Sequence, residues 1–377
     1  MAIYLDNAAT TPMATEVVDK MYEILKHDFG NPSSTHSFGR NAKAIIENAR
    51  RSIAKMINCQ PKEIVFTSGG TEADNMAILC AVKDLGVNHI ITSEIEHHAV
   101  GHAVETVVAK HNVKVSYVKF TDNGHVDLEN LEALLSEHEG KSIVSLMHAN
   151  NEVGNLLPIQ KVSQLCRQYN AYFHSDTVQT MGHYPVDLEQ LDIDFITCSA
   201  HKFHGPKGIG FLYVNKELQI KPFIEGGAQE RGLRGGTENI SGIVGLTKAL
   251  ELANTDIQDH INHVQGIKTH MIESLRAKIE GVSFNGDINP ESSLYTVLNV
   301  LLPNFRKEEM LLFLLDLEGI ACSGGSACTS GANVGSHVLQ GIKADTTRSN
   351  VRFSFSRYTT KREVDVTIDK LVKIMAD

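Results

Sequence analysis

The sequence lacks the features that mark several classes of protein. Its 377 residues contain no run of Lys and Arg, and the formal net charge is −10; this argues against nucleic-acid binding, which needs clustered basic side chains. The six cysteines show no Cys-x-x-Cys spacing, so we expect neither a disulfide framework nor a metal site of the zinc type. There is no apolar run of membrane-spanning length, and MAIYLDNAATTP does not resemble a signal peptide. We therefore expect a cytoplasmic protein with no membrane or nucleic-acid partner.

What is present fits an ordinary globular protein of two domains. Hydrophobic residues make up 42% of the chain and charged residues 21%, and the length exceeds what one core usually serves. Over residues 63–214, short apolar runs such as EIVFTS, HIITSE and DFITCS alternate with helical segments, which predicts an α/β fold with a mostly parallel central sheet. Helical periodicity and two strand-like runs, TVLNVLL and VRFSFSR, follow. We predict a large domain at residues 15–255 and a smaller α+β domain at residues 1–14 and 256–377.

Lys202 is the first candidate for catalysis. It follows an apolar run and precedes a Gly/Pro turn in ITCSAHKFHGPKGIG, which places it at the mouth of the sheet. An isolated lysine is more often a solvated loop residue. Three other segments favour a catalytic role.

In EIVFTSGGTEADNMAIL, a Gly-Gly turn joins a strand to the start of a helix. The backbone N–H groups of Gly70 and Thr71 would then form a phosphate site at the positive end of the helix dipole. The alternative is a plain capped helix, with Thr71 as the cap and Asp74 as the acidic residue three positions on.

Polar side chains also follow two other predicted strands. Asp176 ends the apolar run in AYFHSDTVQTMG, and Gln179 comes three residues later. An acid there can keep a pyridinium nitrogen protonated, which makes the ring an electron sink, although Asp176 could also cap a following helix. His97 and His98 follow HIITSE; such an imidazole can stack on a flat cofactor and exchange protons, or be an ordinary surface or core residue.

Nine segments together resemble the NifS/IscS-like cysteine desulfurases of the class V aminotransferase family, which are pyridoxal 5′-phosphate enzymes of fold type I. They occur in family order over nearly the whole chain: LDNAATTP, GNPSSTHSFGR, TSGGTEADN, HANNEVG, HSDTVQ, SAHKFHGPKG, RGGTEN, SGGSACTSG and VRFSFSR.

The resemblance implies roles for residues that match these segments. Lys202 would bind the cofactor covalently and later move the α-proton of the substrate. Asp176 would face the pyridine nitrogen, Gln179 the ring hydroxyl, and His97 would stack on the ring and act as an acid/base. The phosphate would be held by Gly70, Thr71, Ser199 and His201, together with Thr237 of a neighbouring subunit, which implies a homodimer. Asn151 would fix cofactor and substrate, and Arg352 would bind the substrate carboxylate through its two-pronged guanidinium.

Cys328 selects the reaction. It lies in ACSGGSACTSGANVGSH, among Gly, Ser, Thr and Asn, where we expect the accessible loop that a nucleophilic thiolate needs. We expect Cys59, Cys80, Cys166 and Cys198, in apolar surroundings, to be inert; Cys322 would be structural, with a redox partnership to Cys328 as an alternative.

The resulting hypothesis is desulfuration of L-cysteine to L-alanine, with a persulfide on Cys328. A sulfur-acceptor protein would then take the sulfur for iron–sulfur cluster or thio-cofactor synthesis; the sequence does not indicate which. A selenocysteine lyase or aminotransferase on the same scaffold remains an alternative, as does a non-catalytic sulfur-relay subunit.

Overall fold

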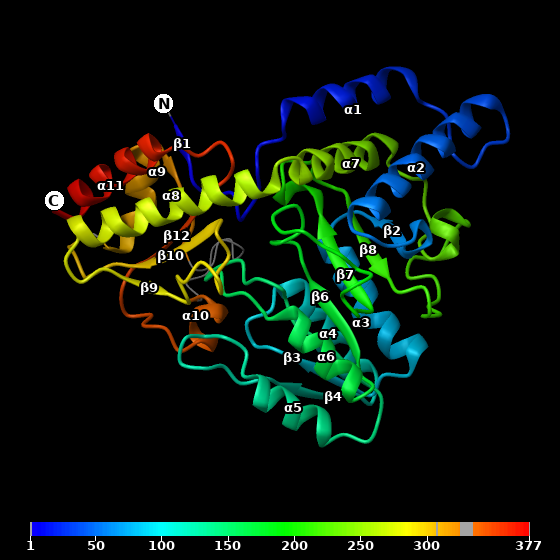
Figure 1. Ribbon diagram of the computed structural model, residues 1–377, viewed down its shortest axis with the longest axis horizontal. Coiled ribbons are helices and arrows are strands. Elements are labelled where there is room, and N and C mark those ends of the chain that lie inside the picture. Colours follow the sequence, from blue (N-terminus) through cyan, green and yellow to red (C-terminus); the bar gives the residue numbers. More distant parts are fainter. Residues whose placement is uncertain (1, 307, 325–334, 377) are drawn as a thin grey trace.

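The computed structural model describes residues 2–306, 308–324 and 335–376. Its largest sheet has seven strands in the order β2-β8-β7-β6-β5-β3-β4 (Figure 1). β8 pairs antiparallel with both of its neighbours, and the other pairs are parallel. The strands are β2 (Ile64–Thr67), β3 (His89–Thr92), β4 (Lys114–Tyr117), β5 (Ser142–Ser145), β6 (Tyr172–Asp176), β7 (Phe195–Ser199) and β8 (Gly210–Val214).

This sheet is buried on both faces because its apolar side chains point alternately to two cores. In β2, Ile64 and Phe66 belong to one hydrophobic cluster, whereas Val65 belongs to the other. Continuous apolar runs are therefore needed, which is typical of strands covered by helices on both sides. The predicted α/β fold with a mostly parallel sheet is confirmed.

Two sets of helices supply the covering layers. α3 (Gly70–Leu85) and α4 (His98–Lys110) contribute to the cluster that contains Val65. The opposite cluster draws on α1 (Thr15–His27), α2 (Ser37–Met56), α5 (Leu128–Ser136), α6 (Ile159–Gln168) and α7 (Ile240–Asn254).

The C-terminal part builds a separate core around a smaller sheet. Its antiparallel strands have the order β12-β10-β9, and the parallel pair β1-β11 brings in the N-terminus. Figure 1 shows both chain ends on this side of the molecule. The elements are β1 (Ile3–Tyr4), α8 (Ile257–Lys278), β9 (Ser283–Asn285), β10 (Val297–Leu301), α9 (Leu311–Leu317), β11 (Ile320–Ala321), α10 (His337–Gly341), β12 (Asn350–Ser354) and α11 (Lys361–Ala376).

We propose that the chain divides into a large domain at residues 15–255 and a small domain at residues 1–14 and 256–377. The distribution of the cores supports this division. The two clusters of the large sheet draw on buried residues between Ala14 and Leu250, while the third draws on Ile3, Leu5 and residues from Val264 to Ile374.

Among the described residues, no helix combines the length and the apolarity that a bilayer crossing requires.

Candidate active site

A cavity of about 320 Å³ lies at the carboxyl ends of the parallel strands, where open α/β sheets bind their ligands. Its walls come from the residues that follow β2, β3, β5, β6 and β7 and from the N-terminal segment. The lining residues include ten of the predicted site residues: Gly70, Thr71, His97, Asn151, Asp176, Gln179, Ser199, His201, Lys202 and Arg352.

Two predicted residues are not in this set. Thr237 is exposed and does not line the cavity of its own chain. Cys328 lies outside the described residues.

Lys202 is held by the N-terminal segment. Its Nζ donates hydrogen bonds to the carbonyl oxygens of Ala8, at 2.6 Å, and Ala9, at 2.9 Å. The Gln179 side chain donates to the same Ala8 oxygen at 3.1 Å. Sequence reasoning assigned no role to Ala8 or Ala9, because a backbone carbonyl leaves no mark on residue type; the only signal was their position inside LDNAATTP.

Two buried carboxyl groups and an imidazole meet in the cavity wall. The ligand atoms of Asp74, His97 and Asp176 all lie within 4.8 Å of one another. Burial raises the pKa of Asp74 to about 7, and burial together with the Asp74 charge raises the pKa of Asp176 to about 7. Burial lowers the pKa of His97, although the Asp176 charge opposes this shift. Burial therefore disfavours the charged forms of both carboxyl groups, and a cation beside them would restore those charged forms.

The Asp74 carboxyl group also lies beside a second imidazole, that of His174. The nearest basic group to Asp74 is His174, whose Nε2 lies 3.4 Å from Oδ1. Burial lowers the pKa of His174 to about 4, so this imidazole is neutral at pH 7. A protonated pyridine nitrogen would place a positive charge beside these two carboxyl groups.

The phosphate end of the site is formed by the start of α3. This helix begins at Gly70, its N-cap is Gly69, and no side chain caps it; the alternative of a helix capped by Thr71 is wrong. A Cβ atom on Gly70 would lie 2.8 Å from Cγ2 of Val178, so only glycine fits this approach. The free N–H groups of the first turn remain open to an anion.

The side chains beside this helix start are neutral or polar. Ser199 is buried. Burial, together with the charges of Lys202 and Lys207, lowers the pKa of His201 to about 4, and its Nδ1 lies 3.1 Å from the Thr10 hydroxyl. His201 can therefore take part in a hydrogen bond at the phosphate end without adding charge.

The alternatives left open for the strand-end residues are now decided. The residues after Asp176 form a turn, not a helix, so Asp176 is no helix cap, although its Oδ1 accepts a hydrogen bond from the Val178 N–H at 2.8 Å. His97 lines the cavity, whereas His98 stacks against His102 outside it.

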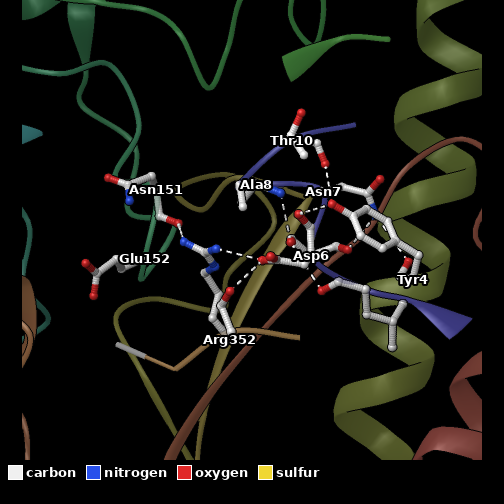
Figure 2. A network of polar contacts seen from close by, with 12 residues as sticks. Tyr4, Asp6, Asn7, Ala8, Thr10, Asn151, Glu152 and Arg352 are labelled. Carbon is white, nitrogen blue, oxygen red and sulfur yellow. Dashed lines mark hydrogen bonds and ion pairs between the residues drawn. The ribbon is translucent and has the colours of Figure 1, made fainter. Parts of the chain in front are cut away.

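Arg352 forms the opposite wall from β12. Figure 2 shows its guanidinium between Asp6 and the backbone of Asn151. Nη2 donates to Asp6 Oδ1 at 2.8 Å and Nη1 donates to the Asn151 carbonyl at 3.1 Å. Nε is buried and has no acceptor among the described residues. A carboxylate entering the cavity could accept from it.

Known proteins resemble this chain over nearly its whole length, in sequence and in structure. Residues 3–366 match the model of the aminotransferase class-V family. A cysteine desulfurase IscS of Dictyoglomus turgidum is 42% identical over 99% of this chain and 94% of its own length. The solved structure of a NifS-like protein superposes with a TM-score of 0.91 at 36% identity, and covers 100% of both chains. A NifS-like protein from Rickettsia africae gives 0.89 at 31% identity, also over 100% of both chains.

Matches of this extent, in sequence over nearly the whole chain and in structure over all of it, leave one assignment. The chain belongs to the aminotransferase class-V family and, within it, to the cysteine desulfurases.

Proposed function

We propose that this chain is a cysteine desulfurase that takes the sulfur of L-cysteine, leaves it as a persulfide on Cys328 and releases L-alanine. One observation carries the proposal. A single cavity holds an amine in Lys202, a buried carboxyl in Asp176 and a guanidinium in Arg352, the three groups that handling an amino acid on pyridoxal 5′-phosphate requires.

The residues present fit this cofactor. A cation beside Asp176 would restore the charged forms of the buried carboxyl groups, and the N-terminus of α3 offers an anion site. We propose that the cofactor is held by Gly70, Thr71, His97, Asn151, Asp176, Gln179, Ser199, His201 and Lys202. When bound, it supplies an electron-withdrawing ring that stabilises negative charge at the substrate's α-carbon.

The chain's own groups would then do the following. Arg352 and Asn151 bind and orient the substrate, with the guanidinium on its carboxylate. Lys202, whose amine is positioned in the cavity by hydrogen bonds to the carbonyls of Ala8 and Ala9, would be the base that takes the α-proton. His97, with its lowered pKa, accepts or returns a proton at the ring side of the cavity.

The sulfur transfer needs a thiolate, and the described cysteines are poorly suited to provide one. None of them lines the cavity. Burial raises the pKa of Cys59, Cys80 and Cys322 to about 12 and raises those of Cys166 and Cys198 as well, so their thiolate fractions at pH 7 are negligible. This supports Cys328 as the nucleophile.

In the transfer step, Sγ of Cys328 forms a bond to the substrate sulfur and the bond from that sulfur to Cβ breaks. The electron pair of the broken bond stays on the carbon fragment, which gains a proton and leaves as L-alanine. The enzyme keeps the sulfur as a persulfide, so no outside oxidant or reductant is needed. We propose that a sulfur-acceptor protein of iron–sulfur cluster or thio-cofactor synthesis takes it, in the cytoplasm.

The proposal predicts the products of one incubation. The purified holoenzyme with L-cysteine and a reducing thiol should form L-alanine and sulfide in equal amounts. Without the reducing thiol, the peptide that contains Cys328 should gain the mass of one sulfur atom. L-alanine formation with no mass gain on that peptide would contradict the persulfide, and formation of pyruvate or an amino-group exchange would indicate another reaction of the family.

We also propose that the enzyme is a homodimer. The side of α1 that faces away from α7 exposes apolar side chains at helical spacing, at Val18, Tyr22 and Leu25, and Phe29 extends this face. Figure 1 shows α1 at the edge of the molecule, on α7. Thr237, exposed and outside its own cavity, lies just before α7. Apolar faces of this kind mark protein interfaces, and a second copy would cover them.

The dimer can be tested at Leu25, which is 68% exposed in the single chain. The wild type should sediment as a dimer, and Leu25→Glu should raise the dimer dissociation constant by about 100-fold, because it buries a charge in an apolar contact. Leu317→Glu is the matched control, since Leu317 is 67% exposed on α9, and should leave the dimer intact. A wild-type monomer with full activity would rule out the shared site.

A further inference from the structure

Arg352 is a cation in a buried position. The side chain is 4% exposed, and a buried guanidinium is stable only when charge and hydrogen bonds compensate it. Within the described residues, Asp6 is the carboxylate that forms an ion pair with it, through Nη2 and Oδ1 at 2.8 Å. The second anchor, the Asn151 carbonyl, is neutral.

Asp6 is itself fixed from two sides. The Ser323 hydroxyl donates to the same Oδ1 atom at 2.8 Å. Ser323 and Arg352 exchange both backbone hydrogen bonds, at 3.3 and 2.7 Å, and Asp6 forms a parallel bridge with Ser354 on β12. The carboxylate, the guanidinium and the hydroxyl thus come from three chain segments that are joined through their backbones. Figure 2 shows the contact between Asp6 and Arg352.

This arrangement controls which way the guanidinium points. Asp6 and Asn151 occupy its two terminal nitrogens and leave Nε, which is buried and has no acceptor among the described residues. A competing carboxylate also lines the cavity: Glu152 accepts from the Ser336 hydroxyl at 2.5 Å, and the Arg352 charge lowers its pKa, against the larger effect of burial. Without the Asp6 charge, the guanidinium would be drawn toward Glu152.

We infer that Asp6 is a positioning residue for substrate binding: through its ion pair with Arg352 and its hydrogen bond from Ser323, it holds the guanidinium where the carboxylate of L-cysteine can accept from it. The inference rests on the proposed function, in which Arg352 binds that carboxylate. Asp6 is not among the residues that line the cavity, so it would act on the substrate through Arg352.

The test is Asp6→Asn in the holoenzyme. The amide keeps the size and one acceptor oxygen but loses the charge, so the guanidinium is no longer held in one orientation. A carboxylate contact made equally in the ground state and the transition state affects KM and not kcat. We expect KM for L-cysteine to rise about tenfold, with kcat changed by less than about twofold.

A second probe separates positioning from general loss of structure. Cysteamine carries the amine and thiol of L-cysteine but no carboxylate. Its dissociation constant, followed by the visible absorption of the bound cofactor, should be the same in Asp6→Asn and the wild type. An equal weakening of cysteamine and L-cysteine would show that Asp6 only supports the fold, and would overturn the inference.

Asp287→Asn is the matched control. The Asp287 side chain is 21% exposed, against 20% for Asp6, and it too accepts from a serine hydroxyl and contacts a basic side chain, His125. This variant should leave both the KM for L-cysteine and the dissociation constant of cysteamine unchanged. If Asp6→Asn fails to retain cofactor, Asp6→Glu is measured in its place. We expect the same rise in KM for L-cysteine and an unchanged dissociation constant for cysteamine, because the longer side chain displaces the guanidinium.

The variant Arg352→Gln separates a failure of the Asp6 inference from a failure of the proposed function. If it raises KM for L-cysteine and neither Asp6 variant does, the inference on Asp6 is wrong and the proposed function stands. If it leaves KM unchanged, the assignment of Arg352 in the proposed function fails. When Arg352→Gln is combined with Asp6→Asn, the increase in KM should equal that of Arg352→Gln alone, because both substitutions remove the same contact with the substrate carboxylate.

Discussion

Replacing Lys202 by Ala should abolish turnover of L-cysteine, with a loss of at least about 10⁴-fold, because the variant lacks both the amine that binds the cofactor and the base that takes the α-proton. The fold should survive. The hydrogen bonds of the side chain to Ala8 and Ala9 are worth together about 2 kcal/mol, against a total stability of about 5–15 kcal/mol.

Borohydride reduction gives the measurement. In the wild type, it should fix pyridoxal 5′-phosphate on the peptide that contains Lys202, and the Lys202→Ala variant should show no fixed cofactor. Lys207→Ala is the control, since Lys207 is an exposed lysine five positions on and should keep both labelling and turnover. Label on any lysine other than Lys202 in the wild type would refute the assignment.

Cys328→Ser should stop sulfur transfer, with a loss of about 10³-fold or more, and leave the earlier steps intact. Lys202, Asp176 and Arg352 need no protein thiol to bind the substrate, so L-cysteine should still change the visible spectrum. A serine hydroxyl is too poorly ionised near pH 7 to attack sulfur, whereas an unperturbed thiol has a pKa of about 8.5 and gives a usable thiolate fraction.

Sulfide and L-alanine formation measure this effect, with Cys322→Ser as the control. Burial raises the pKa of Cys322 to about 12, so its loss should cost far less than that of Cys328. If Cys328→Ser still released sulfide and L-alanine at the wild-type rate, the enzyme would be a lyase that eliminates sulfur without a protein nucleophile. Selenocysteine, with its better leaving group, would then be a substrate to test.

Much of the architecture could be predicted because local patterns determine it. Runs such as IVFT and FITCS are apolar at every position, as a strand between two helical layers must be, and all the predicted runs between residues 63 and 214 form strands or helices of the sheet domain. Candidate residues placed at strand ends, such as Asp176 and Lys202, meet in one cavity, since the carboxyl ends of parallel strands share one edge.

The remaining features of the site depend on contacts between distant parts of the chain, which no local sequence pattern indicates. The sequence pattern offers Asp74 only as the acidic residue of a capped helix, yet it is buried beside His174 and lines the cavity. Asp6 and Arg352 are separated by 346 positions, and Ala8 acts through its carbonyl oxygen. Such contacts require the three-dimensional structure, and the roles assigned by resemblance stay predictions until the variants are measured.

The N-terminal segment also bears on how the enzyme is made. Residues 6–9 leave the ribosome first, but their partners on β12 are among the last to be synthesised, and Asp6 must wait for Arg352, Ser323 and Ser354. Closing a loop of this length costs entropy that only the finished small sheet can offset. The large sheet can therefore be complete before the N-terminal segment that contacts Lys202 is fixed in place. A nascent chain halted before residue 350 would carry the lysine but not Arg352, which forms the opposite wall of the cavity.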